Sequence, residues 1–229
     1  MGEKEMSKEA DQQKEAVVKI CKVKLNVADQ NYISAVKLRG FLGSLFVDDA
    51  EFHHHSERSY HYPLIQYKRV NGELMVIGLQ NYANVLVNKL SSIDTVSTAQ
   101  GTFEVNSKEI EMQTWPVCSR TCFYEFVTPW IPLNEKNYAA FTVMDKEQQK
   151  VFLEKILVGN TLSCLKGLGI FVTYRINSQI TMFRPLCVKA HGNPFEAFKA
   201  RFCLNVDLPD FIGLGKSVSK GFGTIRRVA

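Results

Sequence analysis

Histidines are concentrated in one short segment of this chain. Four of the five histidines in the 229-residue sequence lie in EFHHHSERSYHYP, residues 51–63. In an extended chain, side chains two residues apart point to the same side, so His53 and His55 converge while His54 points away. Imidazole changes charge near neutral pH without a special environment, and two converging imidazoles can serve as general base and general acid. The segment is therefore a candidate site for proton transfer.

Two alternative interpretations of this segment stay open. His53, His55 and His61 could bind zinc together, with Glu51 or Glu57 as a further ligand. Ligands this close on one loop usually need an anchoring helix or a distant fourth residue, so we favour proton transfer and expect no metal and no cofactor. The other alternative is a histidine-rich surface loop without chemistry.

The C-terminal segment FIGLGKSVSKGFGTIRR, residues 211–227, combines glycines with basic residues. No Asp or Glu occurs from residue 213 to the end of the sequence. Glycines let backbone amides and cationic side chains reach phosphate oxygens without steric clash. The segment lacks the sequence context of a P-loop or of a dinucleotide-binding fingerprint. We therefore expect a phosphate-contacting surface that is not a nucleotide loop.

The first half of the chain begins with a strand pattern and a helix pattern. Residues 17–27 alternate apolar and polar side chains, as a half-buried strand does. Residues 31–48 place apolar side chains at helical spacing, which predicts an amphipathic helix with Gly40 and Ser44 on its far side. These small residues, with Lys37 beside them, would let another backbone or a phosphate approach closely.

A hairpin and a second helix complete the pattern of this half. An Asn-Gly dipeptide separates the β-like runs 63–70 and 73–79, which is the strongest short-range signal for a hairpin. Residues 81–92 have helical spacing, and residues 102–113 predict two short strand pieces. The order strand, helix, strand, strand, helix, strand predicts a ferredoxin-like α+β domain, with two helices on one face of an antiparallel sheet.

The second half predicts another α+β unit with a weaker pattern. A strand running into a proline-limited turn is expected within residues 120–133, and a helix begins at about Asp145. Further strands are expected at 170–176 and 179–191. Residues 195–209 fit a helix or a strand, and alternating apolar residues favour a strand in their latter part.

Composition sets limits on the class of protein. Hydrophobic residues make up 45% and charged residues 22%, which is ordinary for a soluble globular protein, and no apolar run approaches the ~18 residues of a membrane span. The N-terminal residues 1–16 are polar and lack the apolar segment of a secretory signal. We expect a cytoplasmic protein with no membrane association and with reduced cysteines. The net charge of +5 permits an anionic partner.

Three of these features resemble one family, the CRISPR-associated repeat-processing endoribonucleases of the RAMP superfamily. Members end in a loop of the form GxGxxxxxGxG, and the residues here that match this spacing are Gly213, Gly215, Gly221, Phe222 and Gly223. The histidine-bearing loop and the segments KLRGFLGSLF and GNTLSCLKGLG resemble the branch found in type I-B systems. The resemblance covers most of the chain from about Val17 and is least over residues 92–130.

The resemblance implies a fold and an activity. The fold would be tandem ferredoxin-like (RAMP/RRM-like) domains at 17–116 and 117–229, after a polar tail at 1–16, with a C-terminal glycine-rich loop. The activity would be metal-independent cleavage of CRISPR precursor RNA within its repeats. Attack by an RNA 2′-hydroxyl would leave a 2′,3′-cyclic phosphate and a 5′-hydroxyl.

The resemblance also implies roles for individual residues. His53, His55 and the downstream Tyr62 would form the cleavage site, with Tyr60 as the second choice for the tyrosine. Candidates for stabilising the extra negative charge of the transition state are Lys37, Arg39 and Arg58. The residues expected to bind RNA are Gly213, Gly215, Lys216, Lys220, Gly221, Phe222, Gly223, Arg226 and Arg227.

RNA is the expected partner, and other CRISPR effector subunits and a second copy of the chain are further candidates. A rival function is that of a non-cleaving RNA-binding protein of the same superfamily, whose fold and glycine-rich loop would look the same. The histidine pair together with Tyr62 favours the enzyme.

Overall fold

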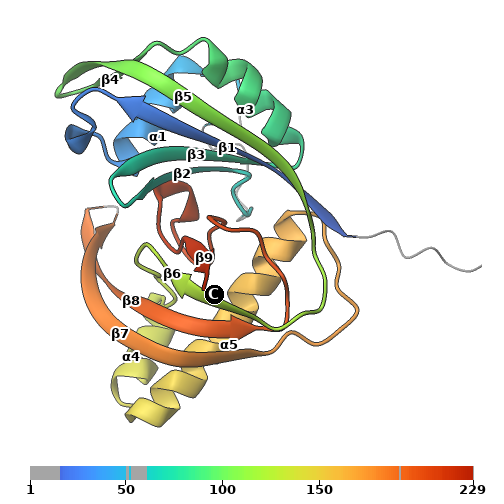
Figure 1. Ribbon diagram of the computed structural model, residues 1–229. Helices are drawn as coiled ribbons and strands as arrows, with labels where there is room; N and C mark the ends of the chain where they lie inside the picture. Colours follow the sequence, from blue (N-terminus) through green and yellow to red (C-terminus); the bar gives the residue numbers. More distant parts are fainter. Residues whose placement is uncertain (1–15, 50–51, 53–60, 191, 229) are drawn as a thin grey trace, which may run out of the picture.

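The computed structural model describes residues 16–49, 52, 61–190 and 192–228 (Figure 1).

The first sheet of the structure belongs to the N-terminal half of the chain. Five antiparallel strands lie in the order β2-β3-β1-β5-β4. They are β1 (Val17–Val27), β2 (Ile65–Val70), β3 (Glu73–Leu79), β4 (Thr95–Thr98) and β5 (Gly101–Pro116). Helices α1 (Ala35–Leu45) and α3 (Asn81–Ser91) pack on one face of this sheet.

Local sequence signals explain most of these elements. Ser34 caps α1 because its side chain accepts a hydrogen bond from the Lys37 backbone N–H at 3.2 Å. The hairpin turn has positive φ at both central residues, 52° at Asn71 and 87° at Gly72, as a type I′ turn requires. Gly40 and Ser44 are exposed on the outer side of α1, as predicted. The predicted ferredoxin-like order is confirmed, with β4 as an addition.

The prediction of two short pieces at 102–113 was wrong. Strand β5 runs without a break for 16 residues; its residues 101–104 pair with β4, and its residues 105–116 pair with β1. The pairing shifts at one place, where Asn26 lies opposite Ser107 and Val27 lies opposite Val105. Asn106 is therefore the extra residue of a β-bulge, which bends a strand without ending it.

The second sheet belongs to the C-terminal half. Its antiparallel strands lie in the order β7-β8-β6-β9 and are β6 (Cys122–Phe126), β7 (Ser178–Ala190), β8 (Asn193–Leu204) and β9 (Ile225–Arg227). Helix α4 (Glu135–Thr142) precedes the long helix α5 (Lys146–Gly167). The predicted helix start is confirmed, because Asp145 is the N-cap and forms a capping box with Gln148. The chain is thus a mixed α+β protein with tandem ferredoxin-like domains.

Other predictions for this half were wrong or incomplete. Residues 170–176 are irregular rather than a strand, and side chains satisfy nearby backbone groups: Asn205 donates to the Arg175 carbonyl and accepts from the Asn177 N–H. The ambiguous segment is strand from Asn193 onward. Helix α4 escaped prediction because it buries little apolar surface, with Phe141 as its buried residue.

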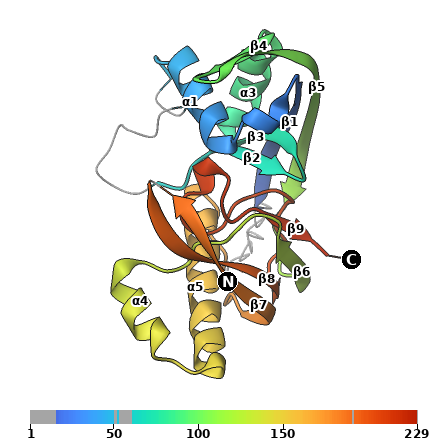
Figure 2. The same cartoon turned by 90° about the vertical axis from the view of Figure 1, so that its left-hand side faces the viewer.

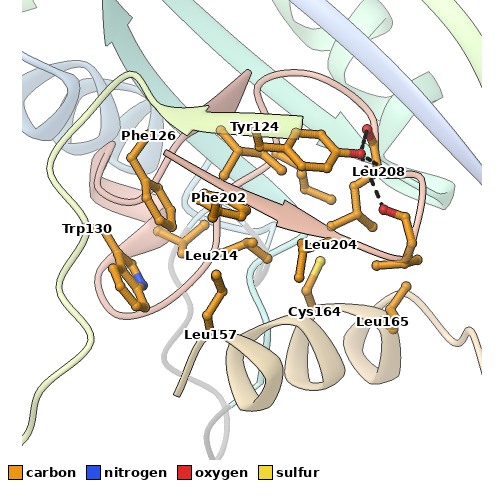
Figure 3. Packing of buried hydrophobic residues seen from close by; sticks show 14 of the residues in the cluster. Tyr124, Phe126, Trp130, Leu157, Cys164, Leu165, Phe202, Leu204, Leu208 and Leu214 are labelled. Carbon is orange, nitrogen blue, oxygen red and sulfur yellow. Dashed lines mark hydrogen bonds between the residues drawn. The ribbon is translucent and has the colours of Figure 1, made fainter. Parts of the chain in front are cut away.

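One face of the second sheet packs on α5. Figure 3 shows Tyr124 of β6 and Phe202 and Leu204 of β8 directed toward this helix, where Leu157 and Leu165 lie. The Tyr124 hydroxyl accepts a hydrogen bond from the Leu208 backbone N–H at 2.7 Å, and burial raises the pKa of this tyrosine. Residues that alternate with these along the strands therefore face away from α5.

Among the described residues, no helix is both long enough and apolar enough to span a membrane.

Candidate nucleic-acid interface

The glycine-rich loop lies between the two domains. In Figures 1 and 2 the red C-terminal segment, which includes the short helix η2 (Val218–Lys220), runs between β2 and the β7–β8 hairpin. Gly221 has φ of 93°, and a Cβ there would lie 2.9 Å from the Ala35 Cβ and 3.1 Å from the Tyr67 carbonyl oxygen. Only glycine permits both this backbone conformation and this close approach. The loop is therefore built to pack against the N-terminal domain.

A buried hydrogen-bond network joins this loop to Gln66 of β2 and to Tyr62, which lies three residues before that strand begins. The Tyr62 hydroxyl donates to the Gly213 carbonyl at 2.7 Å. The Gln66 amide donates to the same hydroxyl at 2.9 Å and accepts from the Gly213 backbone N–H at 3.1 Å. Tyr62 is the second-last residue of the histidine segment 51–63. The network therefore fixes this end of the segment against the glycine-rich loop.

A buried lysine lies next to the same network. The Lys68 ammonium nitrogen makes no hydrogen bond to any residue that the structure describes, and a Cβ at Gly213 would come within 2.9 Å of it. Complete burial lowers the pKa of Lys68 to about 7, with the Cys164 thiol acting in the opposite direction. Burial likewise raises the pKa of Cys164 to about 12. The same Cβ would lie only 2.3 Å from the Val218 Cγ1, so glycine at position 213 leaves room for the Val218 side chain as well as for the lysine.

Two basic side chains from different domains approach each other at this boundary. Burial lowers the pKa of Lys220, and repulsion from the Arg39 guanidinium lowers it further. Arg39 lies on α1, and η2 contacts both α1 and β2. The same guanidinium acts on the buried hydroxyl of Tyr67, although burial dominates and raises the pKa of that tyrosine. Two cations held close together favour the binding of an anion between them, and an RNA phosphate is such an anion.

The remaining predicted basic residues have different surroundings. Lys216 is partly buried, which lowers its pKa, while Glu135 nearby raises it. Arg226 lies 2.6 Å from Glu125. Arg227 pairs with Asp207 and lies over the rings of Trp115 and Tyr124. Arg226 and Arg227 are thus both engaged in ion pairs within the C-terminal domain.

The remaining residues predicted for the site lie at several separate places in the chain. The Lys37 ammonium donates to the Tyr32 carbonyl at 2.7 Å, which fixes it at the start of α1. Phe222 is partly buried and packs in a small cluster with Ile131 and Ala197. His53, His55 and Arg58 lie outside the residues that the structure describes, as does Tyr60. Phe52, just before the histidines, is buried against Phe46 with ring centroids 4.8 Å apart.

Sequence reasoning missed Gln66 and Lys68. Both are fully buried although they lie in a strand of ordinary appearance. No local signal was present, because Gln66 and Lys68 alternate with Ile65 and Tyr67, which is the pattern of a strand with one face in solvent. Buried polar side chains in a strand indicate a packed partner on the second face, which here is the glycine-rich loop.

Comparison with known proteins identifies the family. Residues 16–115 match the Cas6b N-terminal domain and residues 117–228 match the Cas6b C-terminal domain. The chain belongs to the Cas6b family. The family resemblance expected from the glycine spacing and the histidine loop is thus confirmed.

Solved structures agree with this Cas6b assignment. A crystal structure of Cas6b is 25% identical, with a TM-score of 0.84 over 93% of this chain and 100% of that chain. A CRISPR RNA processing endoribonuclease Cas6b is 24% identical with a TM-score of 0.74 over the same shares, a likeness of fold. An uncharacterized protein of Methanocaldococcus jannaschii is 38% identical over 120 residues, which are 52% of this chain and 82% of that protein.

Proposed function

We propose that this Cas6b-family protein is an endoribonuclease that cuts CRISPR precursor RNA within its repeats. The observation that carries the proposal is the junction of the two domains. There the basic, glycine-rich loop is hydrogen-bonded to Tyr62, which lies near the C-terminal end of the histidine segment. An RNA strand on this loop would lie next to the segment that bears the proton-transferring side chains.

The proposed reaction uses a nucleophile that belongs to the RNA. One imidazole removes the proton of a 2′-hydroxyl, and the oxygen attacks the adjacent phosphorus. A second imidazole protonates the departing 5′ oxygen, which leaves a 2′,3′-cyclic phosphate and a 5′-hydroxyl. We assign these roles to His53 and His55 without ordering them. We assign to Arg39 and Lys220 the compensation of the negative charge that grows on the phosphate oxygens, because η2 contacts α1 and the Arg39 charge acts on Lys220.

Tyr62 contributes to this proposal through its position. Its hydroxyl proton is donated to the Gly213 carbonyl, and its side chain is only 7% exposed. Direct action on the leaving oxygen would require this hydrogen bond to break. In the described arrangement Tyr62 instead fixes its own end of the histidine segment to the glycine-rich loop, and orientation of reacting groups can strongly affect a rate.

The test of the function is a cleavage assay with repeat RNA in excess chelator. We expect a cut within the repeat, an upstream fragment that ends in a cyclic phosphate, and a downstream fragment with a 5′-hydroxyl. End-group analysis by mass spectrometry distinguishes these products from those of a metal-activated hydroxide, which leaves no cyclic phosphate. Binding without any product would favour the non-cleaving alternative.

The lysines of the glycine-rich loop are expected to contribute binding energy. Removal of one phosphate contact by Lys216→Ala or Lys220→Ala should weaken RNA binding across sequences and reduce the slope of log affinity against log salt by about one phosphate. Binding titrations at several salt concentrations measure this slope. Lys150→Ala is a matched control, because it removes the same charge from helix α5, outside the glycine-rich loop. Unchanged slopes in both loop variants would show that the loop is structural.

A further inference from the structure

On the side away from α5, the second sheet has a face that is covered at the hairpin end of β8, where Ala197 is buried, and exposed further along the strands. Because Tyr124, Phe202 and Leu204 point toward α5 (Figure 3), their neighbours along the strands point the other way. The pairing register places Phe123 of β6 opposite Cys203 of β8 on this outer face. We call this side the outer face of the second sheet.

Large apolar side chains are exposed on this outer face. Phe123 is 55% exposed although it lies on β6, one of the two central strands. Met182 of β7 is 46% exposed and lies opposite Arg201 of β8. An exposed aromatic in the middle of a sheet is costly to leave in water, and such patches commonly mark binding surfaces.

Basic side chains surround these apolar groups. Register places Arg184 opposite Lys199, and Arg201 opposite Glu125. The Glu125 carboxylate lies 2.6 Å from Arg226 and 3.4 Å from Arg201, and these arginines hold its pKa below the usual value. The Arg201 side chain remains 58% exposed in this pairing. The outer face therefore carries more positive than negative charge.

The outer face continues from the glycine-rich loop. At the hairpin end of β8, Ala197 packs with Phe222 of that loop. From there Lys199, Arg201 and Cys203 follow at every second residue on the same side of the strand. Successive side chains on one side of a strand are about 6.8 Å apart, a step comparable to that between nucleotides of an extended strand. A chain of RNA leaving the loop would meet basic side chains at the first two of these steps, Lys199 and Arg201.

We propose that the outer face of the second sheet binds single-stranded RNA that continues from the glycine-rich loop. Phe123 stacks on a base, and Lys199, Arg201 and Arg184 contact phosphates. Four-stranded sheets whose central strands carry exposed aromatics bind RNA in this manner. The proposal rests on the proposed function, since it extends the path of the same RNA. The excess of positive charge on this face favours a polyanion such as RNA, and a protein partner is an outcome of the test.

The test compares Phe123→Ala with Phe171→Ala by fluorescence anisotropy. The probe is an oligouridine of about 12 nucleotides, since stacking tolerates any base. Phe171 is a matched control because it is 82% exposed and lies in the irregular segment before β7. We expect Phe123→Ala to weaken binding about fivefold or more and Phe171→Ala to leave it unchanged. Equal affinity of both variants and the parent protein would overturn the proposal.

Photo-crosslinking supplies an independent measurement. The same oligouridine with a single 4-thiouridine should form an adduct that mass spectrometry places at Phe123. Adducts confined to the glycine-rich loop would overturn the proposal. A change of oligomeric mass in Phe123→Ala, with RNA affinity unchanged, would also overturn it and assign the face to a protein.

The two proposals fail in different ways. Phe123→Ala should raise the protein concentration that gives half-maximal cleavage of repeat RNA by about the same factor as its loss of affinity, because the outer face supplies binding energy. If the parent protein cuts repeat RNA and Phe123→Ala binds normally, the outer-face proposal alone is wrong. If the parent protein makes no cut in repeat RNA, the proposed function is wrong, whatever the anisotropy of oligouridine shows.

Discussion

Replacement of His53 or His55 by alanine is expected to abolish most cleavage of repeat RNA while the affinity for RNA changes little. Each substitution removes one proton transfer, which typically contributes ~10²- to 10⁴-fold to a rate. In the proposed mechanism ground-state binding comes mainly from contacts with the glycine-rich loop, so the loss should appear in the single-turnover rate at saturating protein and not in the dissociation constant.

His54→Ala is the matched control for this prediction. In an extended segment its side chain points away from those of His53 and His55, so its variant should cleave at nearly the parent rate. Similar losses at all three positions, together with activity that requires added zinc, would contradict the proton-transfer assignment. That outcome would favour a metal site built from the histidines of the segment.

Elements with strong local patterns could be predicted from the sequence. The β1 strand alternates regularly, the helix at α1 has a cap and an apolar stripe, and the Asn-Gly turn between β2 and β3 allows few alternatives. The signals failed where tertiary structure decides the outcome. A bulge at Asn106 looks like a strand end in the sequence, because a register shift involves the partner strand β1 and leaves no local mark.

The candidate site was predictable in its residue types and not in its contacts. Glycine spacing indicated the C-terminal loop, yet it was interpreted as freedom to approach phosphate. In the structure Gly213 and Gly221 also allow the loop to approach Lys68 and Ala35 of the other domain. Contacts between residues about 150 positions apart, such as that of Tyr62 with Gly213, leave no periodic signal in a single sequence.

RNA that lacks one 2′-hydroxyl is expected to bind but not to be cut. In the proposed mechanism that hydroxyl, immediately upstream of the scissile phosphate, is the nucleophile, so its replacement by hydrogen removes the attacking atom. The phosphate charges that Lys216 and Lys220 would contact are unchanged. Binding should therefore stay within a few-fold of the all-ribose RNA, while no product forms at the modified bond.

The control for this substrate is an RNA with the 2′-hydroxyl removed one nucleotide further downstream. That change alters the sugar pucker near the site equally but leaves the nucleophile in place, so cleavage should continue at nearly the parent rate. Denaturing gels of both RNAs, run beside binding titrations, make the comparison. Cleavage of the first RNA at the same bond would rule out attack by the 2′-hydroxyl, because only an external nucleophile such as metal-bound hydroxide could then reach the phosphorus.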